Sequence, residues 1–292
     1  MGNPGGFMHA AVEELLALLE LEPVERFLFR AQNERAAGPR IFGGQVLAQA
    51  LRAAAHTVDG LDPHSLHAYF LRPGDSRHPL LLEVEPIRDG KSFCTRRVRV
   101  IQRGEAIFSM SASFQVREAG LEHHASMPSW PKPEALEDDV QVARRLEGKD
   151  PNVMPWAVRE RAFESRSVYG FGAPPPEQPV KPAWYRLRER LTADPIVHAC
   201  LLAYVSDMGL MSTSLVPHMA TTPRAHIIGA SLDHAMWFHR PFRVDEWLLH
   251  DRDSPAARGG RGFNRGSFFD AAGRLVASTA QESLIRVRRD QE

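Results

Sequence analysis

Two stretches of the chain carry the hydrophobic spacing of helices packed against a core. Residues 45–58 are rich in alanine and leucine. A second helix is predicted from Asp194-Pro195 to about Ser206, because Asp is a favoured N-cap and Pro is favoured at the first helical position. The apolar stripe of this second helix is continued by Asp207, and its members recur at helical spacing: Ile196, Ala199, Cys200 and Ala203.

Each predicted helix is followed by segments in which apolar and polar residues alternate, the pattern of half-buried strands. A helix followed by a run of antiparallel strands predicts an α+β layer, in which the helix lies against the sheet. It does not fit the strand–helix alternation of a parallel α/β fold. The strand candidates are residues 95–102, 163–169, 184–188, 231–240 and 275–287.

The pattern also repeats within the chain. Residues 69–73 match residues 237–241 at an offset of 168 (237 − 69), and residues 104–113 match residues 273–282 at an offset of 169 (273 − 104). A near-constant offset indicates a duplication. We therefore expect an N-terminal repeat over residues 1–117 and a C-terminal repeat over residues 161–292. A proline-rich and then charged linker over residues 118–160 would join them across the surface.

Composition narrows the class of protein. The chain has 292 residues, 43% of them hydrophobic, and Lys plus Arg equals Asp plus Glu at 36 each, so no overall charge favours nucleic-acid binding. Two cysteines, Cys94 and Cys200, are too few for a disulfide scaffold, which favours a cytoplasmic location. Residues 1–22 predict an amphipathic helix rather than a signal peptide, and we expect no membrane span.

The common sequence motifs for metal and cofactor binding are absent or incomplete in this chain. The stretch Gly229-Ala230-Ser231-Leu232-Asp233 lacks the final glycine of a nucleophile elbow. The chain has no HExxH pair, no P-loop and no dinucleotide fingerprint, and the adjacent His123 and His124 suit a solvated loop better than a metal site. The sequence therefore predicts no metal and no other cofactor.

Three polar residues occupy positions where chemistry is plausible. Asp207 ends an apolar stripe, although a helix that stops earlier would turn it to solvent. Gln281 shares a strand face with less charged neighbours, yet it fits equally a satisfied core amide or an edge position. Ser231, with Asp233 on its face, fits a turn hydroxyl equally well. In the repeat alignment Gln281 matches Ala112 and Ser231 matches Pro63, and a polar group present in only one copy is a functional candidate.

Several motifs in order resemble a known family, acyl-CoA thioesterase II, from the first helix nearly to the end of the chain. Its fold is a double hot dog, in which two tandem repeats each wrap an antiparallel sheet around a long helix. The motifs that carry the resemblance are FGGQ (42–45), HAYFLRPGD (67–75), RDGKSF (88–93), ASFQ (112–115), YVSD (204–207), SLDHAMWFHRPF (231–242) and residues 273–282.

The resemblance implies hydrolysis of fatty acyl-CoA by an activated water, with no metal and no acyl-enzyme. The family's Asp, Thr or Ser, and Gln map onto Asp207, Ser231 and Gln281. Asp207 would be the base, and the other two would orient the water. Many members have Thr where this chain has Ser231, and the hydroxyl is kept.

Other assignments follow as expectations about substrate binding and assembly. Gly43 and Gly44, just before the first helix, would admit the thioester oxygen to backbone N–H groups, with a simple tight turn as the alternative. The CoA phosphates would meet Arg258, Arg261 and Arg265, unless these form a solvated basic strand. By analogy with hot-dog proteins a homo-oligomer, a dimer or tetramer, is expected.

The sequence is also compatible with two other functions. One is a hot-dog hydratase of 3-hydroxyacyl thioesters, which needs a histidine paired with Asp or Glu, for which His67, His198 and His234 are candidates. The other is an acyl-CoA binding protein without catalysis, which would keep the pocket and lose the three polar residues.

Overall fold

The computed structural model describes residues 8–34, 38–150, 153–192, 194–222 and 226–288. Within these ranges thirteen strands form one antiparallel sheet. The first half of the chain supplies β1 (Glu22–Glu25), β2 (Leu28–Ala31), β3 (Asp62–Phe70), β4 (Leu80–Asp89), β5 (Phe93–Gln102) and β6 (Glu105–Gln115). The second supplies β7 (Phe163–Ser167), β8 (Ala183–Leu187), β9 (Ile227–Ser231), β10 (Asp233–Phe238), β11 (Leu248–Arg258), β12 (Arg261–Asp270) and β13 (Leu275–Val287).

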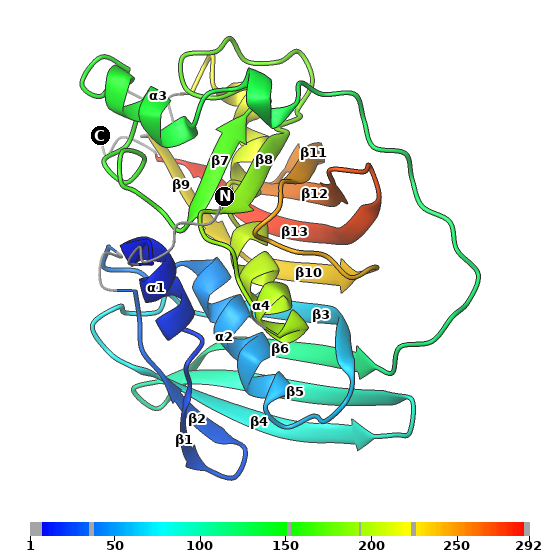
Figure 1. Cartoon of the computed structure of the whole chain (residues 1–292). Helices are drawn as coiled ribbons and strands as arrows, with labels where there is room; N and C mark the ends of the chain where they lie inside the picture. The colour runs from blue at the N-terminus through cyan, green and yellow to red at the C-terminus, as the bar shows by residue number, and fades with distance from the viewer. Residues whose placement is uncertain (1–7, 35–37, 151–152, 193, 223–225, 289–292) are drawn as a thin grey trace.

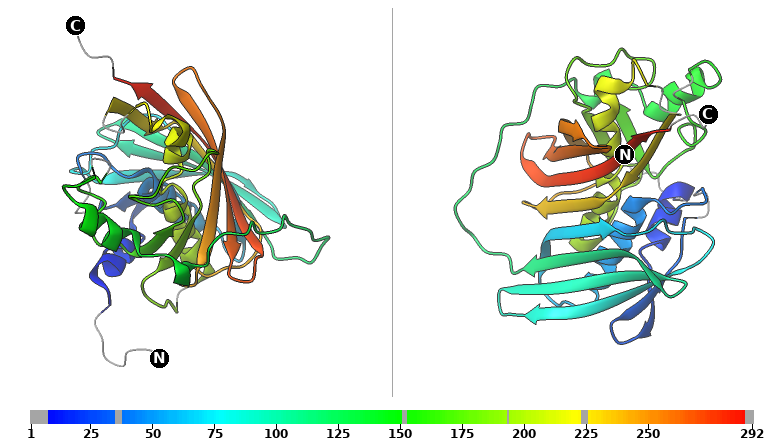
Figure 2. Two further views of the ribbon diagram at one scale, coloured as in Figure 1. Left: turned by 90° about the horizontal axis from the view of Figure 1, so that it is seen from above. Right: turned by 180° about the vertical axis from the view of Figure 1, so that it is seen from behind.

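The strand order places the two halves of the chain side by side. It runs β1-β2-β4-β5-β6-β3-β10-β13-β12-β11-β8-β7, with β9 paired to β13. β3 and β10 meet antiparallel at the centre, where Leu66 pairs with Met236. Each half therefore extends outward from this central pair, and the sheet curves strongly around the helices (Figures 1 and 2).

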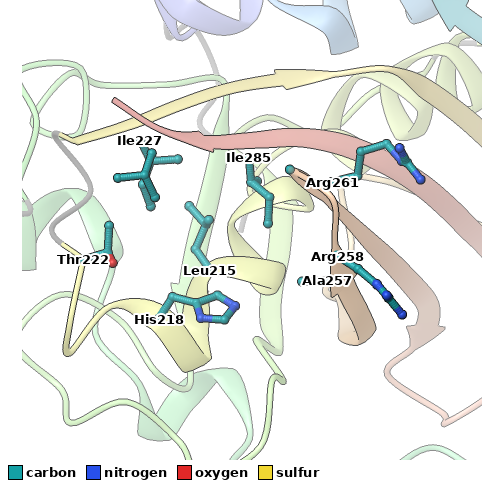
Figure 3. A pocket seen from close by; sticks show the side chains of 10 residues that line it. Leu215, His218, Thr222, Ile227, Ala257, Arg258, Arg261 and Ile285 are labelled. Atoms are coloured by element: carbon teal, nitrogen blue, oxygen red, sulfur yellow. The ribbon is translucent and has the colours of Figure 1, made fainter. Parts of the chain in front are cut away.

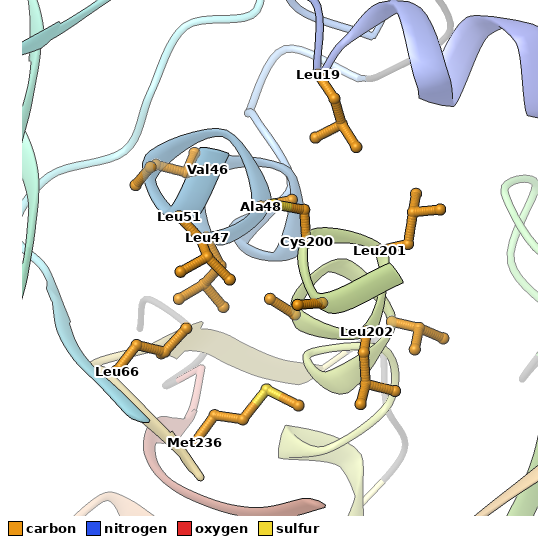
Figure 4. Packing of buried hydrophobic residues seen from close by; sticks show 14 of the residues in the cluster. Leu19, Val46, Leu47, Ala48, Leu51, Leu66, Cys200, Leu201, Leu202 and Met236 are labelled. Carbon is orange, nitrogen blue, oxygen red and sulfur yellow. The ribbon is translucent and has the colours of Figure 1, made fainter. Parts of the chain in front are cut away.

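The concave side of the sheet holds two long helices, α2 (Gly43–Ala55) and α4 (Pro195–Ser206), which lie next to each other (Figure 1). Apolar side chains of both helices belong to one core cluster with the sheet, among them Leu47 and Leu51 of α2 and Cys200 and Leu202 of α4 (Figure 4). All four side chains are fully buried, and burial of this kind contributes about 1.5–3 kcal/mol for each large apolar side chain. The expected α+β layer is confirmed.

The ends of α4 follow from its sequence. The Asp194 side chain accepts a hydrogen bond from the backbone N–H of Ile196, and Pro195 occupies the first turn. The helical stretch Pro195–His218, which includes the 3₁₀ helix η2 (Met211–His218), is long and apolar enough to span a membrane by composition, with a mean hydropathy of 1.4. The expectation that no stretch of the chain has the length and hydropathy of a membrane span is therefore wrong. Its apolar window of 18 residues is 67% buried inside the protein, as in a core helix.

The remaining helices lie outside the central layer. α1 (Ala10–Ala17) falls within the amphipathic stretch expected at the N-terminus, of which residues 1–7 lie outside the described ranges. Residues 116–132 run beside the sheet from β6 towards β7 without a helix or strand (Figure 1). The 3₁₀ helix η1 (Pro133–Ala135) and α3 (Asp139–Leu146) follow, and Asp139 hydrogen-bonds Ser167 of β7. The later part of the expected linker is therefore folded against the second half.

Candidate active site

Asp207 is the residue that caps the C-terminus of α4, directly after Ser206. Its side chain does not turn to solvent, since Asp207 is only 8% exposed. A carboxylate in such a place needs hydrogen-bond donors. Ser231, at the end of β9, donates its Oγ–H to Asp207 Oδ1 across 3.2 Å.

Gln281 completes the group from β13 and is fully buried. Its Nε2 donates to Ser231 Oγ at 3.0 Å and to Ser283 Oγ at 3.2 Å. The structure thus brings together the helix end, β9 and β13 through one line of hydrogen bonds. We call Asp207, Ser231 and Gln281, which these hydrogen bonds join, the catalytic trio for the role that we propose for them.

Asp233 is the rival carboxylate, and it serves a different purpose. Its Oδ1 accepts the backbone N–H of Glu282 at 2.7 Å, which joins the start of β10 to β13. Burial is the largest influence on the Asp233 carboxyl and raises its pKa. The strand expected to run unbroken from Ser231 is interrupted at Leu232, so Ser231 and Asp233 belong to β9 and β10 respectively.

His234 joins the site, and the sequence argument considered it only as a hydratase residue. Its Nδ1 lies 2.6 Å from Gln281 Oε1, and its Nε2 lies 2.9 Å from Ser206 Oγ. Burial lowers the pKa of this imidazole, although the nearby Asp207 acts in the opposite direction. A signal for it was available, because at the repeat offset of 168 it matches the apolar Leu66.

The N-terminus of α2 lies against the same carboxylate. A methyl group at Gly43 would lie 2.6 Å from Asp207 Oδ2, and one at Gly44 would lie 2.2 Å from the backbone oxygen of Tyr204. Only glycine allows α2 to begin so close to the end of α4. The N-cap residue Phe42 contributes no side-chain hydrogen bond, so no side chain caps the first turn of α2 in the described structure. The partial positive charge of that turn faces the trio.

A cavity of about 230 Å³ opens farther along β13, between η2 and the β11–β12 hairpin (Figure 3). Leu215, Ile227 and Ile285 form its apolar wall, and Arg258 and Arg261 lie at its polar side. Ile285 is on the same face of β13 as Gln281, four residues further on, which places it about 13 Å from the trio along the strand.

The three arginines expected near phosphates are not equivalent. Arg261 pairs with Glu282 at 2.9 Å, and Arg265 pairs with Asp253 through a short ion pair. The ion pairs seen among the described residues do not engage Arg258. Arg265 does not line the cavity, so the structure brings Arg258 and Arg261 to it and leaves Arg265 on the outer side of β12.

The described residues contain no group of three or more His, Cys, Asp or Glu side chains placed to hold a metal ion. The histidines that a hydratase would use are occupied otherwise. The His67 ring contacts Trp237 edge-on, and His198 Nδ1 accepts the backbone N–H of Val244. Together with His234, which contacts Gln281 and Ser206, none of them hydrogen-bonds a carboxylate in the described part of the chain.

Comparison with known proteins shows the family to which the chain belongs. The model of the family described as acyl-CoA thioesterase matches residues 173–284, and that described as acyl-CoA thioesterase N-terminal domain matches residues 32–115. Acyl-CoA thioesterase 2 of Haemophilus influenzae is 37% identical over 287 residues, which cover 96% of this chain and 99% of that protein.

Solved structures are similar over nearly the whole chain. An acyl-CoA thioesterase II from Mycobacterium marinum has 42% sequence identity and a TM-score of 0.78, with 95% of this chain and 99% of that chain covered. A protein from Alicyclobacillus acidocaldarius described as having a hot dog fold has 21% identity and a TM-score of 0.76, with 97% and 100% covered, and supports the fold alone. The chain therefore belongs to the acyl-CoA thioesterase family and has the double hot-dog fold.

Proposed function

We propose that this acyl-CoA thioesterase hydrolyses fatty acyl-CoA with one water molecule that Asp207, Ser231 and Gln281 activate. The observation that carries the proposal is the unbroken line of hydrogen bonds from Gln281 Nε2 through Ser231 Oγ to Asp207 Oδ1, at 3.0 and 3.2 Å. A buried carboxylate beside a fixed hydroxyl can hold a water by two hydrogen bonds. Such orientation removes much of the barrier to attack.

The reaction needs no covalent intermediate. The water oxygen attacks the thioester carbonyl carbon while Asp207 takes one of its protons. Negative charge develops on the carbonyl oxygen, and the first turn of α2 at Gly43 and Gly44 supplies backbone N–H groups and a positive dipole end for it. The carbon–sulfur bond then breaks, and the CoA thiolate takes the proton from Asp207. The products are a fatty acid and CoA.

Release of free thiol from acyl-CoA, followed with a thiol reagent, tests the proposal. Asp207→Asn keeps the shape of the side chain and removes the base, so kcat should fall about a hundredfold or more. Asp233→Asn is the matched control, because an amide oxygen still accepts the Glu282 N–H. The assay should give the same rates with EDTA. Wild-type turnover by Asp207→Asn, with an inactive Asp233→Asn, would overturn the assignment of the base.

We propose further that the CoA nucleotide binds at the cavity beside η2. Arg258 supports this because it lines the cavity and has no ion pair among the described residues, whereas Arg265 is neutralised by Asp253. Arg258→Gln should raise KM for acyl-CoA severalfold with little change in kcat, since a remote phosphate contact contributes binding to ground and transition states alike. Arg265→Gln should leave KM unchanged. An equal effect of both substitutions would contradict this placement.

Three further expectations remain proposals. We propose the repeat boundaries given above, supported by hairpin glycines Gly104 and Gly273, which both have a positive φ, 83° and 80°.

A cytoplasmic location is supported by the two free buried cysteines, and cell fractionation tests it. A homo-oligomer, a dimer or tetramer, is supported by exposed Tyr69 and Trp237 near the centre of the sheet. Light scattering on purified protein tests the assembly.

A further inference from the structure

His234 lies between α4 and the catalytic trio and is almost completely buried. It is 1% exposed, and its two ring nitrogens face Ser206 of α4 on one side and Gln281 of β13 on the other. Its counterpart at the repeat offset is Leu66, which is fully buried among apolar side chains. The fold therefore accepts an apolar residue at this place in one half and has a histidine only in the half that carries the trio.

The direction of the hydrogen bonds can be followed from Asp207 backwards. An ionised carboxylate can only accept, so Ser231 must donate its single proton to Asp207 Oδ1. Ser231 Oγ is then an acceptor towards Gln281. The amide must turn its Nε2 towards Ser231 and its Oε1 away from it, as it does in the structure.

The same matching of donors to acceptors determines which ring nitrogen of His234 carries the proton. Gln281 Oε1 lies 2.6 Å from His234 Nδ1, and two acceptors at that distance would repel each other. Nδ1 must therefore carry a proton. A neutral ring then has a lone pair on Nε2, which lies 2.9 Å from Ser206 Oγ. The Ser206 hydroxyl donates to the Ala203 backbone oxygen at 2.8 Å, and a rotation about its Cβ–Oγ bond turns the same proton to Nε2.

We propose that His234 is a positioning residue, whose Nδ1–H holds the Gln281 amide in the one orientation that makes Ser231 donate to Asp207. The opposite tautomer reverses the chain. With its proton on Nε2, the ring accepts from the Gln281 amide, and Oε1 turns towards Ser231. The Ser231 proton then points at Gln281 and no longer at the base, so the Asp207 carboxylate loses the donor that fixes it beside the water.

The neutral state of the ring is supported by its surroundings. Burial lowers the pKa of His234, which disfavours a second ring proton. The charged and titratable groups that face it are Asp207 at the end of α4, Asp233 at the start of β10 and His250 on β11. Both carboxylates act against the lowering, and burial outweighs them.

Two substitutions separate this role from space filling. An Asn side chain places its amide N–H near the position of Nδ1, whereas Gln reaches the position of Nε2. We expect His234→Asn to keep kcat within a few-fold of wild type and His234→Gln to lose about tenfold or more at unchanged KM, because an unpaired Gln281 Oε1 lets the amide turn. A space-filling role predicts the opposite order, since Asn leaves the larger void.

The two His234 variants can also be compared in a protein that lacks the Gln281 amide. In Gln281→Ala the two His234 variants should have the same kcat, because His234 acts only through that amide. His198→Asn is the control for a buried histidine elsewhere in the same half, and it should leave the ratio of kcat to KM intact. Equal kcat for His234→Asn and His234→Gln in the otherwise wild-type enzyme would overturn the inference.

The wild-type protein provides a test that no folding defect can obscure. In protein labelled with ¹⁵N-histidine, the ring spectrum of His234 should show a protonated Nδ1 and a bare Nε2. A bare Nδ1 would overturn the inference. The inference rests on the proposed trio, and the two fail separately. Full activity of Gln281→Ala would refute the trio, whereas a slow Gln281→Ala with the opposite tautomer would refute only the role of His234.

Discussion

The Ser231 hydroxyl links the two other members of the trio at the scale of single residues. It accepts one hydrogen bond from Gln281 and donates one to Asp207, which leaves one lone pair for a water proton. Serine rotates more freely about χ1 than threonine does, and the hydrogen bond from Gln281 compensates by fixing the hydroxyl. The amide and the hydroxyl therefore act as one unit.

Non-additive kinetics should follow from this arrangement. Ser231→Ala and Gln281→Ala should each lower kcat, by about tenfold or more, with little change in KM, because they orient water and not substrate. The double variant should be only slightly slower than the slower single variant. Steady-state kinetics of the four proteins at one pH measure the coupling. Multiplicative losses would mean that the two side chains act on different steps.

At the scale of elements, the long helix of each half of the chain meets the other beside the trio. Asp207 caps the C-terminus of α4, and α2 begins at Gly43, so the proposed base lies directly against the positive end of a helix dipole. The N-terminus of α4 has fewer backbone N–H groups available for a ligand. Pro195 lacks an N–H, and the Asp194 side chain already accepts from Ile196. One helix N-terminus is thus available for an oxyanion, and the other is closed.

Gly43→Ala tests the close approach of the two helices. The added methyl group would lie 2.6 Å from Asp207 Oδ2 and 3.0 Å from the Phe70 ring, so the carboxylate must shift. We expect kcat to fall about tenfold to a hundredfold, the cost of displacing a catalytic group by about 1 Å.

Gly120→Ala is the control, since nothing lies within 4 Å of its added methyl group. Both proteins should keep their thermal midpoint within a few degrees, because alanine is a good helix former and solvent surrounds residue 120. Unchanged kcat in Gly43→Ala would show that α2 takes no part in the reaction.

At the scale of the whole molecule, duplication explains what the sequence could predict. The offset of 168 residues placed His239-Arg240-Pro241 after β10, as Leu71-Arg72-Pro73 follows β3. The cap at Asp194 fixed the start of α4, and buried and less buried residues alternate over residues 277–284 of β13. These features depend on short stretches of chain, and therefore they are visible in the sequence.

The features that the sequence left open depend on contacts between distant residues. Asp207 and Gln281 each fitted a structural role until the fold joined them through Ser231, 24 and 50 residues away from each in the chain. Arg265 looked like a phosphate ligand because its partner Asp253 lies on another strand. His234 was overlooked as a member of the site for the same reason, since its partners come from α4 and β13.

Buried histidines should make the whole molecule sensitive to acid. His250 is fully buried, stacks on Phe268 at 3.9 Å between ring centroids and leaves its Nδ1 without a partner. Burial lowers its pKa well below the ordinary 6.5. Below pH 6.5 the unfolded chain therefore binds a proton at this residue that the folded protein does not bind. Proton binding by the unfolded chain lowers the free energy of unfolding, so the full stability is present above pH 6.5 and is lost as pH falls from there towards the lowered pKa.

The free energy of unfolding should accordingly fall as pH drops from about 7.5 to about 5.5, by up to about 1.4 kcal/mol per pH unit for each such histidine. His250→Leu removes one of these groups, so its denaturant-unfolding curves should depend on pH less steeply than those of wild type. His123→Leu, on an exposed side chain, should keep the wild-type slope. An equal slope in His250→Leu would mean that the acid sensitivity comes from other groups, first of all His234, whose pKa burial also lowers.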